Sequence, residues 1–214
     1  MVELFPRTIE TERLRLEAIH RDSLETATHF EFYEICSSDP GIDEVTEYVT
    51  WEPHQTPKET LEFVEAVSNK RDENEGTSYL IYPRESEDGA GEIAGGAGFG
   101  IDWEARTMTL GCWLRKRYWG RGYSGERAAA FMKLAFEMLD LDLVAATADV
   151  ENKKSNVAIE RYTERHGGGR DGLVRNGAGI GGEPADVYRY TVSRDEYLES
   201  DPRTASIRFP GFES

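Results

Sequence analysis

The sequence predicts an α/β protein built on one mixed sheet, and three observations carry that prediction. Strand-like and helix-like segments follow one another in the order β-α-α-β-β-β-α-β-α-β-β. Three consecutive strand segments have short, turn-rich joints, which favours antiparallel hairpins. A nearly continuous apolar segment follows a helical one, which indicates a single parallel crossover through a strand buried on both faces. We therefore expect about seven mostly antiparallel strands, a central parallel crossover and flanking helices.

The first half of the chain contributes one strand and two helices. Residues 12–19, "ERLRLEAI", alternate apolar with charged side chains, as a half-buried strand does. Asp22 is expected to cap a helix that runs to about Ile35. Residues 44–55 are aromatic and predict no regular element. Thr56, followed by Pro57 and then by Glu at the third helical position, has the spacing of a helix start.

The second half of the chain supplies the remaining elements. Strands are expected at 77–84, 91–102, 107–116 and 141–150, with a helix from Glu126 between the last two. A helix at 153–166 stops at three glycines, and 171–176 with 185–193 form a closing hairpin. Residues 8–196 are thus expected to form one domain, and 197–214 a tail of unknown role.

The charge balance excludes some classes of function. The formal net charge is −16, with six lysines against 19 arginines. Such a surface repels phosphates, so we expect no nucleic-acid partner. The acids could attract a basic substrate, but their even spread and the scarcity of lysine favour a halophilic source. The chain shows no signal peptide and no apolar run of ~18 residues, so we expect a cytoplasmic protein without a membrane partner.

Cysteine and histidine spacing predicts no metal site. Cys36 and Cys112 lie outside any C-x-x-C motif and are expected to be free, buried thiols. The four histidines show no ligand spacing.

The segment "RKRYWGRGYSGE", residues 115–126, allows two interpretations. Gly120 to Gly125 reads G-x-G-x-x-G, the dinucleotide fingerprint, with Asp149 or Glu151 where a ribose-binding acid would be. Against this NAD-binding interpretation, "RKRYW" separates the glycines from the strand, and antiparallel hairpins precede it. The chain also ends too soon for a doubly wound sheet.

The alternative interpretation is a pyrophosphate loop of the form Arg117-x-x-Gly120-x-Gly122. Glycines let the backbone approach the ligand, and amides at the start of the next helix face it. Arg117 and Arg121, with Lys116, would supply counter-charge. A basic turn that simply pairs with surface acids is the competing explanation.

The segment "LGCWLRKRYWGRGYSGERA" resembles the acetyl-CoA-binding motif of the GNAT N-acetyltransferase superfamily. "NKKSNVAIERY" (152–162) is similar to the Asn-x-x-Ser helix of that family. "IETERLRLEAI", "YVTWEPHQTPKETLEF" and "DVYRYTVS" resemble the branch that acetylates ribosomal-protein N-termini. The resemblance covers roughly residues 8–196.

This resemblance implies acetyl-CoA as cosubstrate and a set of cofactor-binding residues. The acetyl and pantetheine groups would meet the backbone near Trp113 and Leu114, where two strands separate, and Asn152 would meet the pantetheine arm. Amides from Arg117 to Ser124 would take the pyrophosphate. The complete expected set is Trp113, Leu114, Arg115, Arg117, Trp119, Gly120, Arg121, Gly122, Tyr123, Ser124, Asn152 and Ser155.

The resemblance also assigns chemistry. Ser155 matches the serine proposed to protonate the leaving thiolate, and Tyr162 is a weaker candidate for that role. The base is open, because the matching position falls near Ala178 in a glycine-rich insertion. Glu183, Glu92, Asp102 and His54 are candidates, and Trp51 with His54 lies on the segment that shapes the acceptor site. Cys112 is expected to be a core thiol.

The resemblance implies an acetyltransferase, and we expect it to act on a primary amine by direct attack. The resemblance suggests a protein N-terminal α-amine, with small amines left open, and a homodimer is allowed. A CoA-binding domain that senses without catalysing and a Rossmann-type NAD enzyme are the alternatives.

Overall fold

A computed structural model describes residues 3–201 and 206–212. Its centre is an eight-stranded sheet in the order β1-β2-β3-β4-β5-β6-β8-β7. The pair β5–β6 is parallel and the other pairs are antiparallel. The strands are β1 (Thr8–Glu10), β2 (Leu14–Ala18), β3 (Gly76–Pro83), β4 (Gly95–Asp102), β5 (Thr107–Leu114), β6 (Leu143–Asp149), β7 (Gly169–Ile180) and β8 (Glu183–Ser193). The predicted mixed sheet with one parallel crossover is confirmed.

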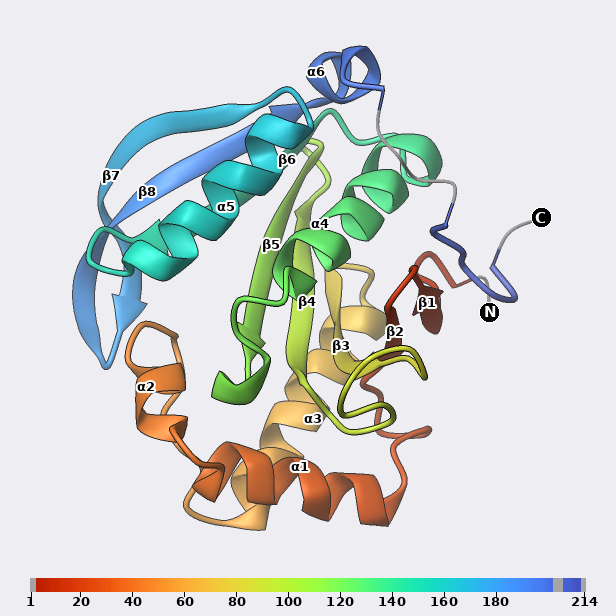
Figure 1. The fold of residues 1–214 in the computed structure, drawn as a ribbon, viewed down its shortest axis with the longest axis vertical. Coiled ribbons are helices and arrows are strands. Elements are labelled where there is room, and N and C mark those ends of the chain that lie inside the picture. Colours follow the sequence, from red (N-terminus) through yellow and green to blue (C-terminus); the bar gives the residue numbers. More distant parts are fainter. Residues whose placement is uncertain (1–2, 202–205, 213–214) are drawn as a thin grey trace.

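Helices cover both faces of this sheet. They are α1 (Thr26–Ser38), α2 (Ile42–Thr46), α3 (Pro57–Asp72), α4 (Tyr123–Lys133), α5 (Lys153–Arg165) and α6 (Arg194–Glu199). Figure 1 shows α4 and α5 over the near face, with α3 behind the sheet and α1 below it. A 3₁₀ turn at Lys116–Tyr118 precedes α4, and a π-helical turn at Leu134–Met138 follows it.

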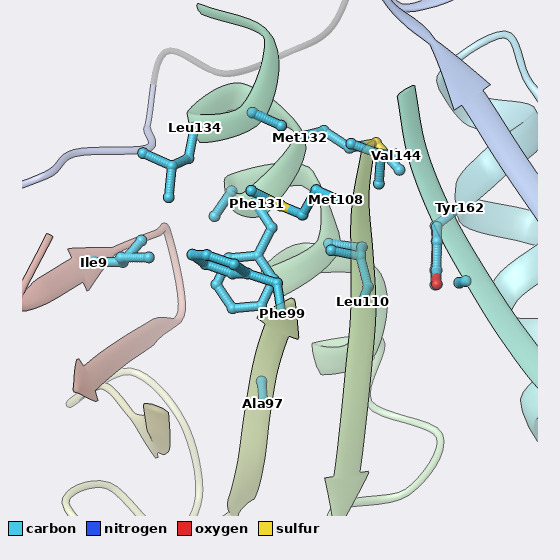
Figure 2. Packing of buried hydrophobic residues seen from close by; sticks show 14 of the residues in the cluster. Ile9, Ala97, Phe99, Met108, Leu110, Phe131, Met132, Leu134, Val144 and Tyr162 are labelled. Carbon is cyan, nitrogen blue, oxygen red and sulfur yellow. The ribbon is translucent and has the colours of Figure 1, made fainter. Parts of the chain in front are cut away.

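Alternation along the central strands divides the core between the two faces. On the α4/α5 face, Phe99, Met108 and Leu110 pack against Phe131 and Tyr162 in the larger cluster (Figure 2). On the α1/α3 face, a smaller cluster joins Leu80 and Tyr82 of β3 to Phe32 and Val64. Met108 and Leu110 of β5 therefore face the larger cluster, whereas Trp113, at an odd-numbered position, packs against the smaller one.

Several expected boundaries are wrong for local reasons. The first helix begins at Thr26 after Glu25, so Asp22 does not cap it. Strand β1 has three residues, too few for alternation to show, and α2 occupies part of a region expected to be irregular. The glycine-rich "insertion" is instead the end of β7, which continues to Ile180 across a register shift between Val174 and Ala178.

The described part of the expected tail packs on the domain. Arg208 forms a bridge with Glu10 of β1. Tyr197, Ile207 and Phe209 are buried in the larger cluster. Residues 206–212 therefore cover the edge of the sheet at β1, whereas Tyr197 packs against Phe136 and His166.

Candidate active site

The parallel strands β5 and β6 separate halfway along their length. Their pairing runs from Thr107–Leu143 to Leu110–Ala146 and goes no further. Beyond that point β5 stays paired with β4 as far as Leu114, and β6 stays paired with β8 as far as Asp149. The two strands thus diverge and leave an opening through the sheet.

Backbone amides of β5 face this opening. The N–H of Arg115 donates to the carbonyl of Ala94, on the β4 side (2.9 Å). Successive N–H groups of a strand point to opposite sides, so those of Cys112 and Leu114 point toward β6. The carbonyl of Leu114 accepts a hydrogen bond from the Trp119 indole (2.7 Å), which fixes the start of the glycine turn against the strand.

Two clefts meet at the carboxyl end of β5. The first, about 630 Å³, lies on the α1/α3 side and is lined by Trp51, Phe63 and Trp113 among others. The second, about 890 Å³, lies on the α4/α5 side and is lined by Leu114 and the glycine turn. Trp113 and Leu114 are consecutive and point to opposite faces. The opening between the strands lies beside these two residues, where it can join the two faces of the sheet.

The glycine turn has a backbone conformation suited to binding an anion. Gly120 and Gly122 have φ of +78° and +82°, a conformation that favours glycine, and Gly122 is the N-cap of α4. A Cβ at Gly120 would meet no atom within 4 Å, so the space above it is open. Among the described residues, nothing accepts the five consecutive N–H groups from Gly120 to Ser124. Free amides at a helix N-terminus favour phosphate oxygens.

The basic side chains of the turn are already paired with acids from other segments. Arg115 binds Asp39 (2.5 Å) and Lys116 binds Glu44. Arg117 binds Glu92 (2.7 Å), and Arg121 binds Asp88 (2.9 Å). The Arg115–Asp39 pair is largely buried and serves to anchor the turn to the end of α1. The other three pairs are exposed, so each contributes little and can exchange with a ligand anion.

Unpaired cations come instead from α5. Arg161 and Arg165 line the second cleft with Tyr162, one helical turn apart. Within the described residues neither arginine forms an ion pair, whereas those of the turn do. The sequence analysis missed them, although their i, i+4 spacing beside Tyr162 was a usable signal.

Three further residues of the expected set shape the turn. Tyr123 is buried and donates to Glu87 (2.7 Å), and Ser124 lines the second cleft. The Lys154 ammonium lies 4.4 Å from the centre of the Trp119 ring, a cation–π contact between the turn and α5.

Asn152 and Ser155 begin helix α5. The Asn152 side chain accepts the N–H of Ser155 (3.0 Å) and caps the helix. Ser155 is half-buried and lines neither cleft, whereas Tyr162 lines the second. The Tyr162 hydroxyl is buried without a hydrogen-bond partner among the described residues. Figure 2 shows this oxygen beside β5, level with Leu110, the last residue paired with β6.

None of the four expected base candidates lines the first cleft. Glu92 binds Arg117, and the Asp102 carboxylate accepts the N–H of Ala105 in a hairpin turn. Glu183 is exposed at the start of β8, and the His54 ring bonds Thr60 (2.7 Å). Trp51 does line the cleft, with its ring 5.3 Å from that of Trp113 and 5.7 Å from that of His54.

The two cysteine thiols differ in how deeply they are buried. Cys36 is buried, as expected. Cys112 packs against the larger cluster on the face of Met108 and Leu110, as expected of a core thiol, but it is only half-buried. The reason for this partial exposure is the separation of β5 from β6, which uncovers this part of the strand.

In the described part of the chain no cluster of His, Cys, Asp and Glu could hold a metal ion. Every helix there is too short or too polar to span a bilayer.

The opening between the parallel strands, beside a turn of free amides, has the geometry of a site for a pyrophosphate-bearing cosubstrate held across a mixed sheet. The sequence profile of the acetyltransferase (GNAT) domain matches residues 13–162, and the chain belongs to this family of acetyl-CoA-dependent acetyltransferases. The sheet is not the parallel, doubly wound sheet that the NAD-binding alternative required.

Individual relatives agree with this assignment. The chain is 24% identical over 191 residues to an uncharacterized N-acetyltransferase, p20, of Bacillus licheniformis, covering 89% of this chain and 98% of that protein. It is 30% identical over 97 residues to a putative ribosomal N-acetyltransferase, YdaF, of Bacillus subtilis strain 168, covering 45% and 51%. The fold matches RimL, a ribosomal L7/L12 α-N-protein acetyltransferase in complex with coenzyme A, with a TM-score of 0.69 at 18% identity, covering 87% and 97%.

Proposed function

We propose that this enzyme transfers the acetyl group of acetyl-CoA to a primary amine by direct attack, without an acyl-enzyme. The observation that carries the proposal is the run of free amides from Gly120 to Ser124 beside the opening between β5 and β6. Acetyl transfer needs the thioester held within reach of an amine and a donor for the developing oxyanion. The β5 amides that face the opening are suited to both tasks.

The cofactor-binding residues divide into three groups. The turn Gly120–Ser124 takes the pyrophosphate, with Arg117 and Arg121 exchanging their acids for it and Arg161 and Arg165 adding charge. Trp113 and Leu114 place the acetyl and pantetheine groups, and Asn152 borders the pantetheine arm. Arg115, Trp119 and Tyr123 hold the turn in position through their own contacts.

Calorimetric titration with acetyl-CoA and, separately, with NAD tests the proposal. Acetyl-CoA should bind with micromolar affinity and NAD should not bind. Acetyl-CoA binding without turnover on any amine would favour a sensing domain. Absence of acetyl-CoA binding would refute the assignment of the turn.

The proton donor to the thiolate is Ser155 in this proposal, with Tyr162 as the second candidate because it lines the second cleft. Ser155→Ala and Tyr162→Phe separate them. The variant of the true donor should lower the rate more than the affinity for acetyl-CoA. Unchanged kinetics in Ser155→Ala would remove Ser155 from the mechanism.

The acceptor we propose is a protein N-terminal α-amine. The names of YdaF and RimL support this class. A panel of tripeptide amides, each compared with its N-acetylated form, and of small amines including phenethylamine would test it. Turnover of small amines alone would contradict the peptide acceptor.

We further propose a cytoplasmic enzyme of a halophilic source, with residues 8–196 as its catalytic domain and a homodimer as its assembly. The net charge of −16 supports the salt adaptation. Unfolding and sedimentation in low and multimolar KCl test both points. Stability should rise with KCl, and a monomer at all concentrations would exclude the dimer.

A further inference from the structure

The first cleft contains almost no charge, although the chain is strongly acidic. The sequence has 41 aspartate and glutamate residues. Among the residues that line this cleft, only Asp149 is acidic and only Lys70 is basic. Lys70 is an exposed residue of the last turn of α3. Apart from the Cys112 thiol, the rest of the lining is aromatic, aliphatic, glycine or hydroxyl-bearing, so Asp149 is its single carboxylate.

The position of Asp149 follows from the separation of the strands. It is the last residue of β6, three residues beyond Ala146, where pairing with β5 ends. Ala146 and Ala148 enter the larger core cluster on the α4/α5 face. Side chains alternate along a strand, so Thr147 and Asp149 point to the other face, where the first cleft lies.

The Asp149 carboxylate has one oxygen in use and one available. Its Oδ1 accepts the N–H of Glu151 (2.7 Å), which holds the side chain in place. In the described residues Oδ2 accepts no hydrogen bond, and no Lys, Arg or His forms an ion pair with the group.

Tyr48, which follows α2, also lines the first cleft. Its hydrogen bond to Glu47 is the main cause that raises the pKa of Tyr48, and the Asp149 charge adds to the rise. Asp149 is therefore close enough to Tyr48 to influence it electrostatically.

We propose that Asp149 binds the ammonium group of the acceptor in the first cleft and accepts its proton. The inference rests on the proposed function and deepens it, because it fills the role of base that the sequence left open. The sequence analysis considered Asp149 only as a ribose-binding acid, because the expected strand separation did not show which residues of β6 it would expose.

The proton balance of the step is complete. The ammonium gives one proton to the Asp149 carboxylate and becomes a nucleophilic amine. The amine nitrogen then forms a bond to the acetyl carbon, and the bond from that carbon to sulfur breaks. The second nitrogen proton ends on the thiolate sulfur, and the Asp149 carboxyl returns its proton to water. The net change is an ammonium and a thioester converted to an amide, a thiol and one proton.

Asp149→Asn is the test variant, and Asp102→Asn is its matched control. Both aspartates end a strand, and the Oδ1 of each accepts a nearby backbone N–H. The asparagine carbonyl can keep that bond, so neither substitution should unfold the chain. Asp102 lies outside the cleft.

The first readout is binding, which needs no turnover. Phenethylammonium and the isosteric neutral 2-phenylethanol are titrated into the CoA-free protein and followed by amide NMR shifts. The wild type and Asp102→Asn should prefer the ammonium by about tenfold, with shifts around 147–151. Asp149→Asn should lose the preference. No preference in the wild type, or an unchanged preference in Asp149→Asn, would overturn the inference.

The second readout is the acetylation rate with the best amine of the panel. Asp149→Asn should lower kcat/KM by about 100-fold while acetyl-CoA binding stays normal, and Asp149→Glu should recover part of the loss. A normal rate in Asp149→Asn overturns the inference and leaves the proposed function intact. Failure of the wild type to bind acetyl-CoA overturns the proposed function, while the ammonium preference remains measurable on its own.

Discussion

The Arg127 guanidinium lies against the Tyr162 ring, 5.9 Å from its centre, and both side chains are buried without satisfying their polar atoms. Arg127 comes from α4 and Tyr162 from α5, so the pair joins the two helices that border the second cleft. The Nε and Nη1 of Arg127 and the Tyr162 hydroxyl have no hydrogen-bond partner among the described residues. Burial raises the pKa of Tyr162, and the Arg127 charge opposes the rise.

An unpaired buried hydroxyl gives a direct prediction for stability. Tyr162→Phe should leave the free energy of unfolding unchanged or raise it by about 1 kcal/mol, because burying an unsatisfied hydroxyl is costly. Tyr79→Phe is the matched control: Tyr79 is equally buried, but it donates to the Pro6 carbonyl (2.9 Å). That variant should lose about 1 kcal/mol in urea unfolding. Equal losses in both variants would show that the Tyr162 hydroxyl has a partner in solution.

Much of the fold could be predicted because its signals are local. The alternation of β2, the helix start at Thr56 and the glycine turn before α4 are each contained in a few residues. The turn was located without any knowledge of its tertiary contacts.

The parts that could not be predicted depend on distant segments. Asp39, Asp88 and Glu92, which pair with the arginines of the turn, lie 25 or more residues away in sequence, and nothing local marks them as partners. The same holds for Asp149: its access to the first cleft depends on where β5 leaves β6. Charge pairing and strand divergence are decided by tertiary structure.

The left-handed glycine of the turn predicts a selective loss of binding. Gly120→Asn keeps a residue that tolerates positive φ, but it places a side chain in the space where we propose the pyrophosphate. Gly182→Asn is the control, because Gly182 has φ +79°, its Cβ would also meet nothing, and it lies in the β7–β8 turn.

Both glycine variants should lose about 1 kcal/mol of stability or less. Only Gly120→Asn should weaken acetyl-CoA binding, by about tenfold or more, which is about 1.4 kcal/mol. Equal affinities in calorimetry would place the ligand elsewhere.

The burial of His166 predicts a pH dependence of stability. Its Nδ1 contacts the Tyr162 carbonyl (2.7 Å), and its ring stacks on Tyr197. Burial lowers the pKa of His166, the hydrogen bond to that carbonyl opposes the change, and the Arg165 charge adds to it. The unfolded chain then binds more protons than the folded chain just below the ordinary histidine pKa of about 6.5.

Stability should therefore fall as the pH falls below about 6.5, by at most about 1.4 kcal/mol per pH unit for this residue. His54, whose pKa burial also lowers, adds a loss of the same sign. His166→Asn retains a donor for the carbonyl and should remove part of the slope. Urea unfolding from pH 5 to 8 measures the difference, and parallel curves for the variant and the wild type would contradict the assignment.

The two thiols should differ in reactivity, because the strand separation exposes only one of them. Burial raises the pKa of Cys36 to about 12, with the Asp39 charge adding to the effect, so Cys36 holds almost no thiolate at pH 8. Cys112 lies in the lining of the first cleft. Iodoacetamide at pH 8 should label Cys112 in the folded protein and Cys36 only after unfolding, as measured by mass spectrometry.

Control variants and bound cosubstrate test this assignment of the labelled thiol. The label on the folded protein should persist in Cys36→Ala and disappear in Cys112→Ala. Saturating acetyl-CoA should slow the labelling of Cys112, because the acyl end would lie in the opening between β5 and β6. Labelling of Cys112 at the same rate with and without acetyl-CoA would show that the thioester does not reach this part of the strand.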